Sequence, residues 1–127
     1  MSTPVRSFMT QPVYSCTLPC DVGHVRDLMT QKECHAMLLV KVESDERIQL
    51  LGIVTSNDLM GVYDDTVDIQ QIMNTNVQSI APEASAQDAA GLMLQNGIHH
   101  LVVREDQRIV GMVSSQDFVA LVAARGI

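Results

Sequence analysis

Two short segments of the sequence place a hydroxyl and a carboxylate three residues apart, directly after an apolar run that starts with glycine. They read Gly52-Ile-Val-Thr-Ser-Asn-Asp58 and Gly111-Met-Val-Ser-Ser-Gln-Asp117. If a helix begins at the hydroxyl residue, the carboxylate can accept hydrogen bonds from two hydroxyls of a ligand. The hydroxyl and the free N–H groups of the first helical turn can face a phosphate. The candidate binding residues are Thr55, Asp58, Ser114 and Asp117, with Asn57 and Gln116 as candidates for further contacts.

The same spacing also has an interpretation without any ligand. A Thr or Ser followed three residues later by an acidic residue is a capping box, in which the two side chains satisfy the first turn of a helix. Ser85 and Asp88 have this spacing at the start of another expected helix. Both interpretations stay open for one copy, so the larger pattern around the two copies decides between them.

The sequence is internally repeated. A shift of 64 positions aligns Met9 with Met73 and His35 with His99, and a shift of 59 aligns the two Gly-to-Asp segments. The five-residue difference falls in the polar stretch 41–47, where a turn between strands tolerates a change of length. We therefore predict two tandem repeats, residues 7–65 and 70–127, with an acidic linker at 63–68.

The apolar pattern and capping residues of each repeat predict the element order β-α-β-β-α. The first strands are expected at 13–16 and 77–80, and helices follow from Asp21 and Ser85. Strand pairs are expected at 36–42 with 49–54 and at 100–104 with 109–113, and the last helices begin near Thr55 and Ser114. The run 118–124 is apolar nearly all round, so it needs a partner surface, either the other repeat or a second chain. The fold class is therefore mixed α/β, of the α+β type.

Composition excludes several classes of function. The chain has 127 residues with 8 basic and 15 acidic side chains, a net charge of −7 that opposes binding to nucleic acid or anionic membranes. No apolar run is long enough for a membrane span. Three cysteines do not make a disulfide framework, so the reducing cytoplasm is the expected location. Elbow, Walker and dinucleotide-binding motifs are absent from the sequence, so we expect no catalysis.

With the repeated Gly-to-Asp segments, the stretches Met73-Asn-Thr-Asn-Val-Gln-Ser-Ile80 and Gly97-Ile-His-His-Leu-Val-Val103 complete a known pattern. The chain resembles a tandem pair of cystathionine-β-synthase (CBS) domains, a Bateman module. The resemblance implies two repeats that pack through their sheets in one pseudo-symmetric unit. It also implies clefts between them for adenosine compounds, non-catalytic regulation of a partner protein that the sequence does not identify, and a homodimer.

The resemblance also implies roles for single residues. Asp58 and Asp117 would hold ribose, while Thr55 and Ser114 would face ribose or phosphate. The strand edges near Val13 and Val77, with Thr75 beside them, would border the adenine. The histidines at the strand entrances, His99, His100 and His35, would donate hydrogen bonds to a phosphate. The alternative is that these histidines bond to backbone carbonyls and contact no ligand.

AMP is the expected ligand, ahead of ADP, ATP and S-adenosylmethionine. No Arg or Lys stands at either strand entrance, and Leu101-Val-Val-Arg104 replaces the family's Leu-Pro-Val-Val. Together with the negative net charge, this disfavours a polyphosphate. No cofactor is required and no metal is expected. The spaced residues Cys16, Cys20 and His24 correspond to Ile80, Ala84 and Asp88 in the second repeat, so the scaffold does not require a metal there. The alternative function is a ligand-free module for dimerisation and assembly.

Overall fold

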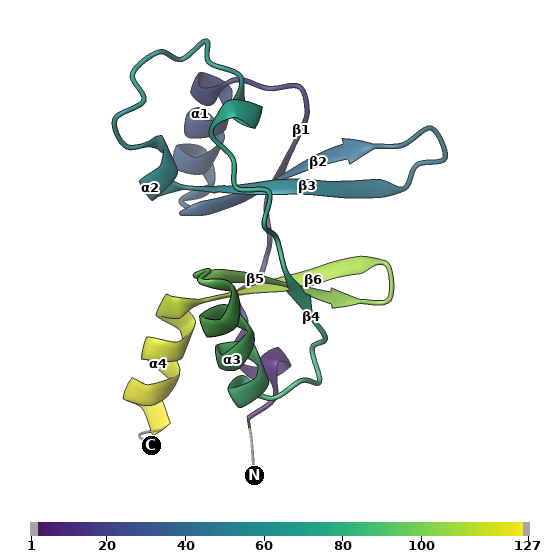
Figure 1. The fold of residues 1–127 in the computed structure, drawn as a ribbon, viewed down its shortest axis with the longest axis vertical. Helices are drawn as coiled ribbons and strands as arrows, with labels where there is room; N and C mark the ends of the chain where they lie inside the picture. The colour runs from purple at the N-terminus through teal and green to yellow at the C-terminus, as the bar shows by residue number, and fades with distance from the viewer. Residues whose placement is uncertain (1–2, 126–127) are drawn as a thin grey trace. The chain divides into compact units, whose positions relative to one another are not determined.

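The computed structural model describes residues 3–125, and these fold as two units (Figure 1). One unit is the continuous stretch 14–77, called here the 14–77 unit. The other combines residues 3–13 with residues 78–125 and is called here the split unit. Each unit therefore contains a leading segment that, in the sequence, precedes the first strand of the other repeat.

The 14–77 unit consists of a three-stranded sheet, two helices and a 3-10 turn. The strands lie in the order β1-β2-β3, with β1 parallel to β2 and β2 antiparallel to β3. A hairpin turn in the polar stretch joins β2 to β3, as the repeat comparison predicts. The elements are β1 (Ser15–Thr17), α1 (Val22–Lys32), β2 (Ala36–Val42), β3 (Ile48–Thr55), α2 (Ser56–Leu59) and η2 (Ile69–Gln71).

The split unit repeats this architecture. Its strands lie in the order β4-β5-β6, again with one parallel and one antiparallel pairing. The predicted mixed fold class and the element order β-α-β-β-α, twice, are confirmed, although the first strands begin about two residues later than expected. The elements are η1 (Val5–Ser7), β4 (Ser79–Ile80), α3 (Ala86–Asn96), β5 (His100–Glu105), β6 (Arg108–Ser114) and α4 (Ser115–Arg125).

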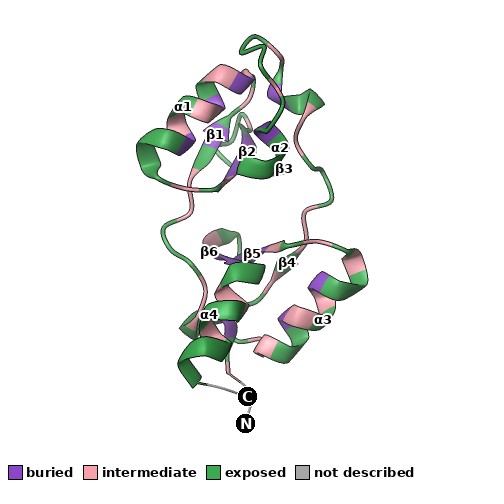
Figure 2. Cartoon of the chain, turned by 90° about the vertical axis from the view of Figure 1, so that its left-hand side faces the viewer, coloured by how far each residue is buried: buried purple, intermediate pink, exposed green. Residues whose placement is uncertain are grey.

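Each unit has its own apolar core between the first helix and one face of the sheet (Figure 2). In the 14–77 unit, α1 contributes Val22, Val25 and Met29, which recur at helical spacing. Strand β2 contributes Met37 and Leu39, which point to the same face because successive strand side chains alternate. The split unit is built in the same way from Val5, Ala89, Met93, Leu101, Val103 and Val113.

The leading segments are attached to their units in matching ways. Residue Thr10 exchanges two backbone hydrogen bonds with Met112 of β6, at 2.7 and 3.1 Å. Asn74 exchanges two with Ile53 of β3, at 2.8 and 2.9 Å. Val5 is fully buried in the core of the split unit, so residues 3–13 are an integral part of that unit.

The closing helices differ in length. Helix α4 continues for 11 residues, whereas α2 ends after four. Met60 has extended backbone dihedral angles, and Gly61 has a φ of +84° that a helix does not accommodate. The chain therefore leaves the helical path directly after Leu59 and forms a loop against α1.

Candidate functional site

Both predicted hydroxyl–carboxylate pairs form complete capping boxes. In the 14–77 unit, Thr55 ends β3 and caps α2. Its backbone N–H and its hydroxyl donate to Oδ2 of Asp58, at 2.8 and 3.0 Å, and its Oγ1 accepts from the Asp58 N–H at 3.3 Å. The carboxylate is thereby held in one orientation at the junction of strand and helix. The interpretation as a capping box is correct, and a fixed, exposed carboxylate also meets the first requirement of a ligand site.

The second pair repeats this geometry in the split unit. The backbone N–H and hydroxyl of Ser114 donate to Oδ2 of Asp117 at 2.8 and 3.2 Å, and Ser114 Oγ accepts from the Asp117 N–H at 3.3 Å. The two junctions are therefore nearly superimposable in their internal hydrogen bonds. Asn57 and Gln116 lie exposed on the first turns of α2 and α4.

The two carboxylates differ in the hydrogen bonds that their second oxygen, Oδ1, accepts. The hydroxyl of Thr10 donates to Oδ1 of Asp117 at 2.8 Å. Within the 14–77 unit, Oδ1 of Asp58 accepts no hydrogen bond. Asp58 is exposed whereas Asp117 is half-buried. Sequence reasoning missed Thr10, although its alignment with Asn74 next to the paired Met9 and Met73 marks the position.

Asn74 takes the place of Thr10 in the 14–77 unit but uses its side chain differently. Its Oδ1 accepts the N–H of Asn76 at 2.8 Å, which closes a local turn. Thr75 is exposed in this turn, and its carbonyl accepts the N–H of Val77 at 2.9 Å. Val77 and its counterpart Val13 are half-buried and lie just before β4 and β1, not within these strands.

Two of the predicted histidines lie beside the capping boxes. The His35 carbonyl accepts the N–H of Ser56 at 2.9 Å, and Nδ1 of its ring lies 3.3 Å from the Ser56 hydroxyl. His99 and Ser115 match this arrangement, at 3.0 and 3.2 Å. Both rings are exposed, so each strand entrance presents an imidazole next to the first turn of a helix.

His100 is placed differently from these two histidines. It is half-buried and opens β5, opposite Ser114 in the strand register. Its register partner is thus the hydroxyl residue of the second box. The counterpart in the 14–77 unit is Ala36, opposite Thr55.

Arg6 and Arg26, two cations that could contact a phosphate, are engaged in ion pairs within their own units. Arg6 forms ion pairs with Glu83 and Glu105, at 2.6 and 2.5 Å. Arg26 binds Asp65 at 2.5 Å and donates to the carbonyl oxygen of Val62 at 2.5 Å. Both guanidinium groups are therefore already paired with carboxylates of their own unit.

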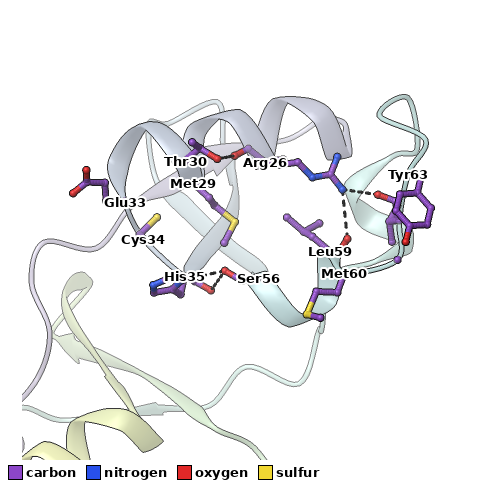
Figure 3. Close-up of a pocket in the computed structure, with 12 residues that line it drawn as sticks. Arg26, Met29, Thr30, Glu33, Cys34, His35, Ser56, Leu59, Met60 and Tyr63 are labelled. Atoms are coloured by element: carbon purple, nitrogen blue, oxygen red, sulfur yellow. Dashed lines mark hydrogen bonds between the residues drawn. The ribbon is translucent and has the colours of Figure 1, made fainter.

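A pocket of about 630 Å³ lies in the 14–77 unit between α1 and the segment that follows β3 (Figure 3). His35 and Ser56 line one side of it, and Arg26 reaches across it to the loop after α2. Neither Thr55 nor Asp58 lines the pocket, so the fixed carboxylate belongs to a different surface. The apolar or aromatic residues around the pocket include Met29, Leu59, Met60, Val62 and Tyr63.

The cysteines form no metal centre in the described part of the chain. Cys16 is buried and Cys20 packs against the same core. Burial raises the pKa of Cys20 to about 12, with further contributions from the Cys16 thiol and the carboxylates of Asp68 and Asp21. Among residues 3–125, no three His, Cys, Asp or Glu side chains converge as ligands for a metal ion.

The helices give no candidate for a membrane span. Between residues 3 and 125, none is both long and apolar enough to cross a bilayer.

Comparison with known proteins identifies the repeats. The family model for the CBS domain matches residues 5–65 and again residues 69–124. An uncharacterized protein of Methanocaldococcus jannaschii, MJ1225, is 24% identical over 98% of this chain. The chain spans only 44% of that relative's length. The mitochondrial CBS domain-containing protein CBSX3 of Arabidopsis thaliana is 30% identical over 84% of this chain and 55% of its own length.

Solved structures share the fold over nearly the whole chain. The CBS domain pair of protein MJ0100, crystallised with 5′-methylthioadenosine and S-adenosyl-L-methionine, has a TM-score of 0.80 at 21% identity. The alignment covers 98% of this chain and 99% of that one. An uncharacterized conserved protein of Pyrococcus horikoshii also reaches 0.80, at 18% identity, covering 98% and 94%. This chain belongs to the CBS domain family and carries two such domains in tandem.

Proposed function

We propose that this CBS domain pair is a regulatory, non-catalytic module that binds an adenosine-containing small molecule, with AMP as the favoured ligand. The observation that carries the proposal is the exposed Asp58 carboxylate, fixed by two donors from Thr55 while its Oδ1 accepts no hydrogen bond within the 14–77 unit. A carboxylate oriented in this way suits the pair of neighbouring hydroxyls on a ribose. The adenosine compounds in the MJ0100 structure support the same ligand class.

The remaining residues divide among the parts of such a ligand. Asp117 is the second ribose position, and Thr55 and Ser114 contribute hydroxyls to ribose or phosphate. The imidazoles of His35, His99 and His100 would donate to phosphate. The backbone and side chains near the first strands, at Val13, Val77 and Thr75, would border the adenine. Asn57 and Gln116 would add polar contacts.

A single phosphate fits the charges of the molecule better than three. The net charge is −7, and both Arg6 and Arg26 are already paired with carboxylates. We therefore expect AMP and 5′-methylthioadenosine to bind more tightly than ATP.

Signalling would pass through a homodimer to a regulated protein in the cytoplasm. Apolar side chains on the helices are exposed, among them Leu94 on α3 at 83% and Val119 on α4 at 60%. Covering such side chains favours association. The ligand changes the state of the partner only if it binds two arrangements of the module with different affinities.

Isothermal titration calorimetry with AMP, 5′-methylthioadenosine, S-adenosylmethionine, ATP and GTP tests the binding function. We expect AMP to bind, GTP not to bind, and Asp58→Asn to weaken AMP binding by about tenfold or more, since an ionic hydrogen bond is lost. Asp88→Asn is the matched control, because Asp88 also follows a capping serine by three residues but lies in the first turn of α3, outside the two Gly-to-Asp segments.

Two results would count against this function. If no adenosine compound binds at millimolar concentration, neither capping box serves a nucleotide, and the ligand-free assembly module becomes the better description. If AMP binds with equal affinity to wild type, Asp58→Asn and Asp117→Asn, the ligand uses another surface. Light scattering of the same samples reports whether the chain dimerises without a ligand.

A further inference from the structure

We infer that Thr10 makes the two ligand positions unequal, so that a ligand with two neighbouring hydroxyls loads at Asp58 first and at Asp117 only when Thr10 is displaced. This inference rests on the proposed function and assigns to Thr10 a role in setting stoichiometry. It follows from a hydrogen bond in one unit that has no counterpart in the other.

The Asp117 carboxylate has few hydrogen-bond acceptor positions left for a ligand. Asp117 accepts three hydrogen bonds within its own unit, two at Oδ2 from Ser114 and one at Oδ1 from Thr10. The Thr10 bond, at 2.8 Å, has the length of a good hydroxyl–carboxylate contact. Asp117 is also half-buried, so a ligand hydroxyl approaching Oδ1 meets protein on one side.

Thr10 is held at this place by its backbone and not by the side-chain bond alone. Its N–H and carbonyl are both bonded to Met112 of β6. Three residues earlier in this segment, Ser7 donates its hydroxyl to the Pro4 carbonyl, and Val5 is buried in the core. The hydroxyl of Thr10 is therefore supplied in place, without the loss of freedom that a ligand hydroxyl undergoes on binding.

The corresponding position in the 14–77 unit carries a residue that cannot take this role in the observed conformation. Asn74 shares the backbone pairing, here with Ile53, but its side chain closes the turn to Asn76. Oδ1 of Asp58 consequently receives no hydrogen bond within the 14–77 unit, and the residue is exposed. A ligand hydroxyl gains a charge-assisted hydrogen bond at Asp58, whereas at Asp117 it only exchanges one such bond for another.

Calorimetric titration with AMP on variants that keep one carboxylate each measures this difference. Asp117→Asn leaves Asp58 as the intact position, and Asp58→Asn leaves Asp117. We expect the first variant to bind AMP at least about tenfold more tightly than the second, the equivalent of one charged hydrogen bond. Wild type should then bind one AMP per chain tightly and a second one weakly.

Thr10→Val in the Asp58→Asn background tests the cause. Valine keeps the size and branching of threonine but has no donor, so AMP binding at Asp117 should tighten about tenfold. Thr17→Val is the matched control, since Thr17 is exposed in β1 and its hydroxyl bonds neither carboxylate. Far-UV circular dichroism and the thermal midpoint establish that the split unit stays folded.

The reciprocal change provides a second, independent measurement. Asn74→Thr in the Asp117→Asn background installs a hydroxyl at the matching place and should weaken AMP binding at Asp58. Equal affinities in the two single-carboxylate variants, or no tightening on Thr10→Val, would overturn the role of Thr10 while leaving the binding function intact. Failure of AMP to bind any of these proteins would overturn both together.

Discussion

The thioether of Met9 lies against the backbone of Gly111, where a Cβ atom would come within 2.5 Å of the methionine sulfur. The same relationship joins Met73 to Gly52 in the other unit, with 2.7 Å to the sulfur. Each Gly-to-Asp segment therefore begins with a glycine because a methionine from the leading segment occupies the space of its side chain. This contact brings Thr10 and Asn74, the residues that follow, to the strand end beside the capping box.

Substituting these glycines should destabilise the protein by displacing the leading segments. We expect Gly111→Ala to lower the free energy of unfolding by about 1–3 kcal/mol, the usual cost of overpacking. Met9→Ala added to Gly111→Ala should restore much of this loss, because the three atoms nearest to the added Cβ all belong to the Met9 side chain. Urea unfolding followed by far-UV circular dichroism measures both variants.

Gly52 provides the comparison for this prediction. Its added Cβ would also lie 3.1 Å from the carbonyl oxygen of Asn74, and this backbone atom does not move away as a side chain does. Met73→Ala should therefore rescue Gly52→Ala less completely than Met9→Ala rescues Gly111→Ala. Equal rescue in both units would contradict the role of the Asn74 carbonyl.

Arg26 should be the main support of the loop that replaces the end of α2. Its guanidinium group contacts Asp65 and the carbonyl oxygens of Val62 and Leu59 at the same time, and a lysine cannot copy this fork. We expect Arg26→Lys to cost about 1–2 kcal/mol of stability, the value of hydrogen bonds to a charged group. Hydrogen exchange should show faster opening of residues 60–66.

The control for Arg26 is the exposed pair Arg47–Asp45 in the β2–β3 turn. The two charges are only two residues apart and lie in solvent, so Arg47→Lys should change stability by less than about 0.5 kcal/mol. If both lysine variants behave alike, Arg26 contributes only a surface ion pair.

Much of the fold is predictable from sequence because both repeats carry the same signals twice. Short continuous apolar runs predict β2 and β5 with their partners, and Asp21 and Ser85 correctly mark the starts of α1 and α3. The spacing of Ser85 and Asp88 also indicates the capping bond in which the Ser85 hydroxyl oxygen accepts the Asp88 N–H at 3.0 Å. Local signals of this kind need no knowledge of distant contacts.

The exchange of leading segments was not predictable in the same way. An internal alignment matches Met9 with Met73, but it does not say which sheet each methionine covers. That choice depends on long-range packing, and it decides whether Thr10 or Asn74 lies next to a given carboxylate. The early end of α2 also depends on tertiary contacts, since the loop after Leu59 is held by Arg26 from another helix.

The corresponding ends of α1 and α3 allow the cost of backbone strain to be compared in the two repeats. Both helices end on a left-handed residue, Glu33 with a φ of 54° and Gly97 with a φ of 61°. Only glycine adopts this region without a steric cost. We expect Glu33→Gly to stabilise the 14–77 unit by up to about 1 kcal/mol and Gly97→Ala to destabilise the split unit by a similar amount.

Tyrosine fluorescence separates these two effects. Both tyrosines, Tyr14 and Tyr63, lie in the 14–77 unit, so their signal follows unfolding of that unit. Glu33→Gly should move the tyrosine transition to higher urea concentration, while Gly97→Ala should move the circular dichroism transition to lower concentration. A destabilised Glu33→Gly variant would mean that the Glu33 side chain makes a contribution larger than the backbone cost.

Cys20 should make stability fall in alkaline solution. Burial and the neighbouring Cys16 thiol raise the pKa of Cys20 to about 12 in the folded protein, whereas an unfolded thiol titrates near 9. The folded state then keeps a proton that the unfolded state releases, so this contribution is complete below pH 9 and is lost as the pH rises toward 12. Urea unfolding between pH 7 and pH 10.5 should show stability declining above pH 9, less steeply in Cys20→Ala.

The same protonation should make alkylation of Cys20 by iodoacetamide at pH 8 much slower than that of an unfolded control. Alkylation at the rate of a free thiol, or an equal alkaline decline in Cys20→Ala, would contradict a protonated, desolvated Cys20.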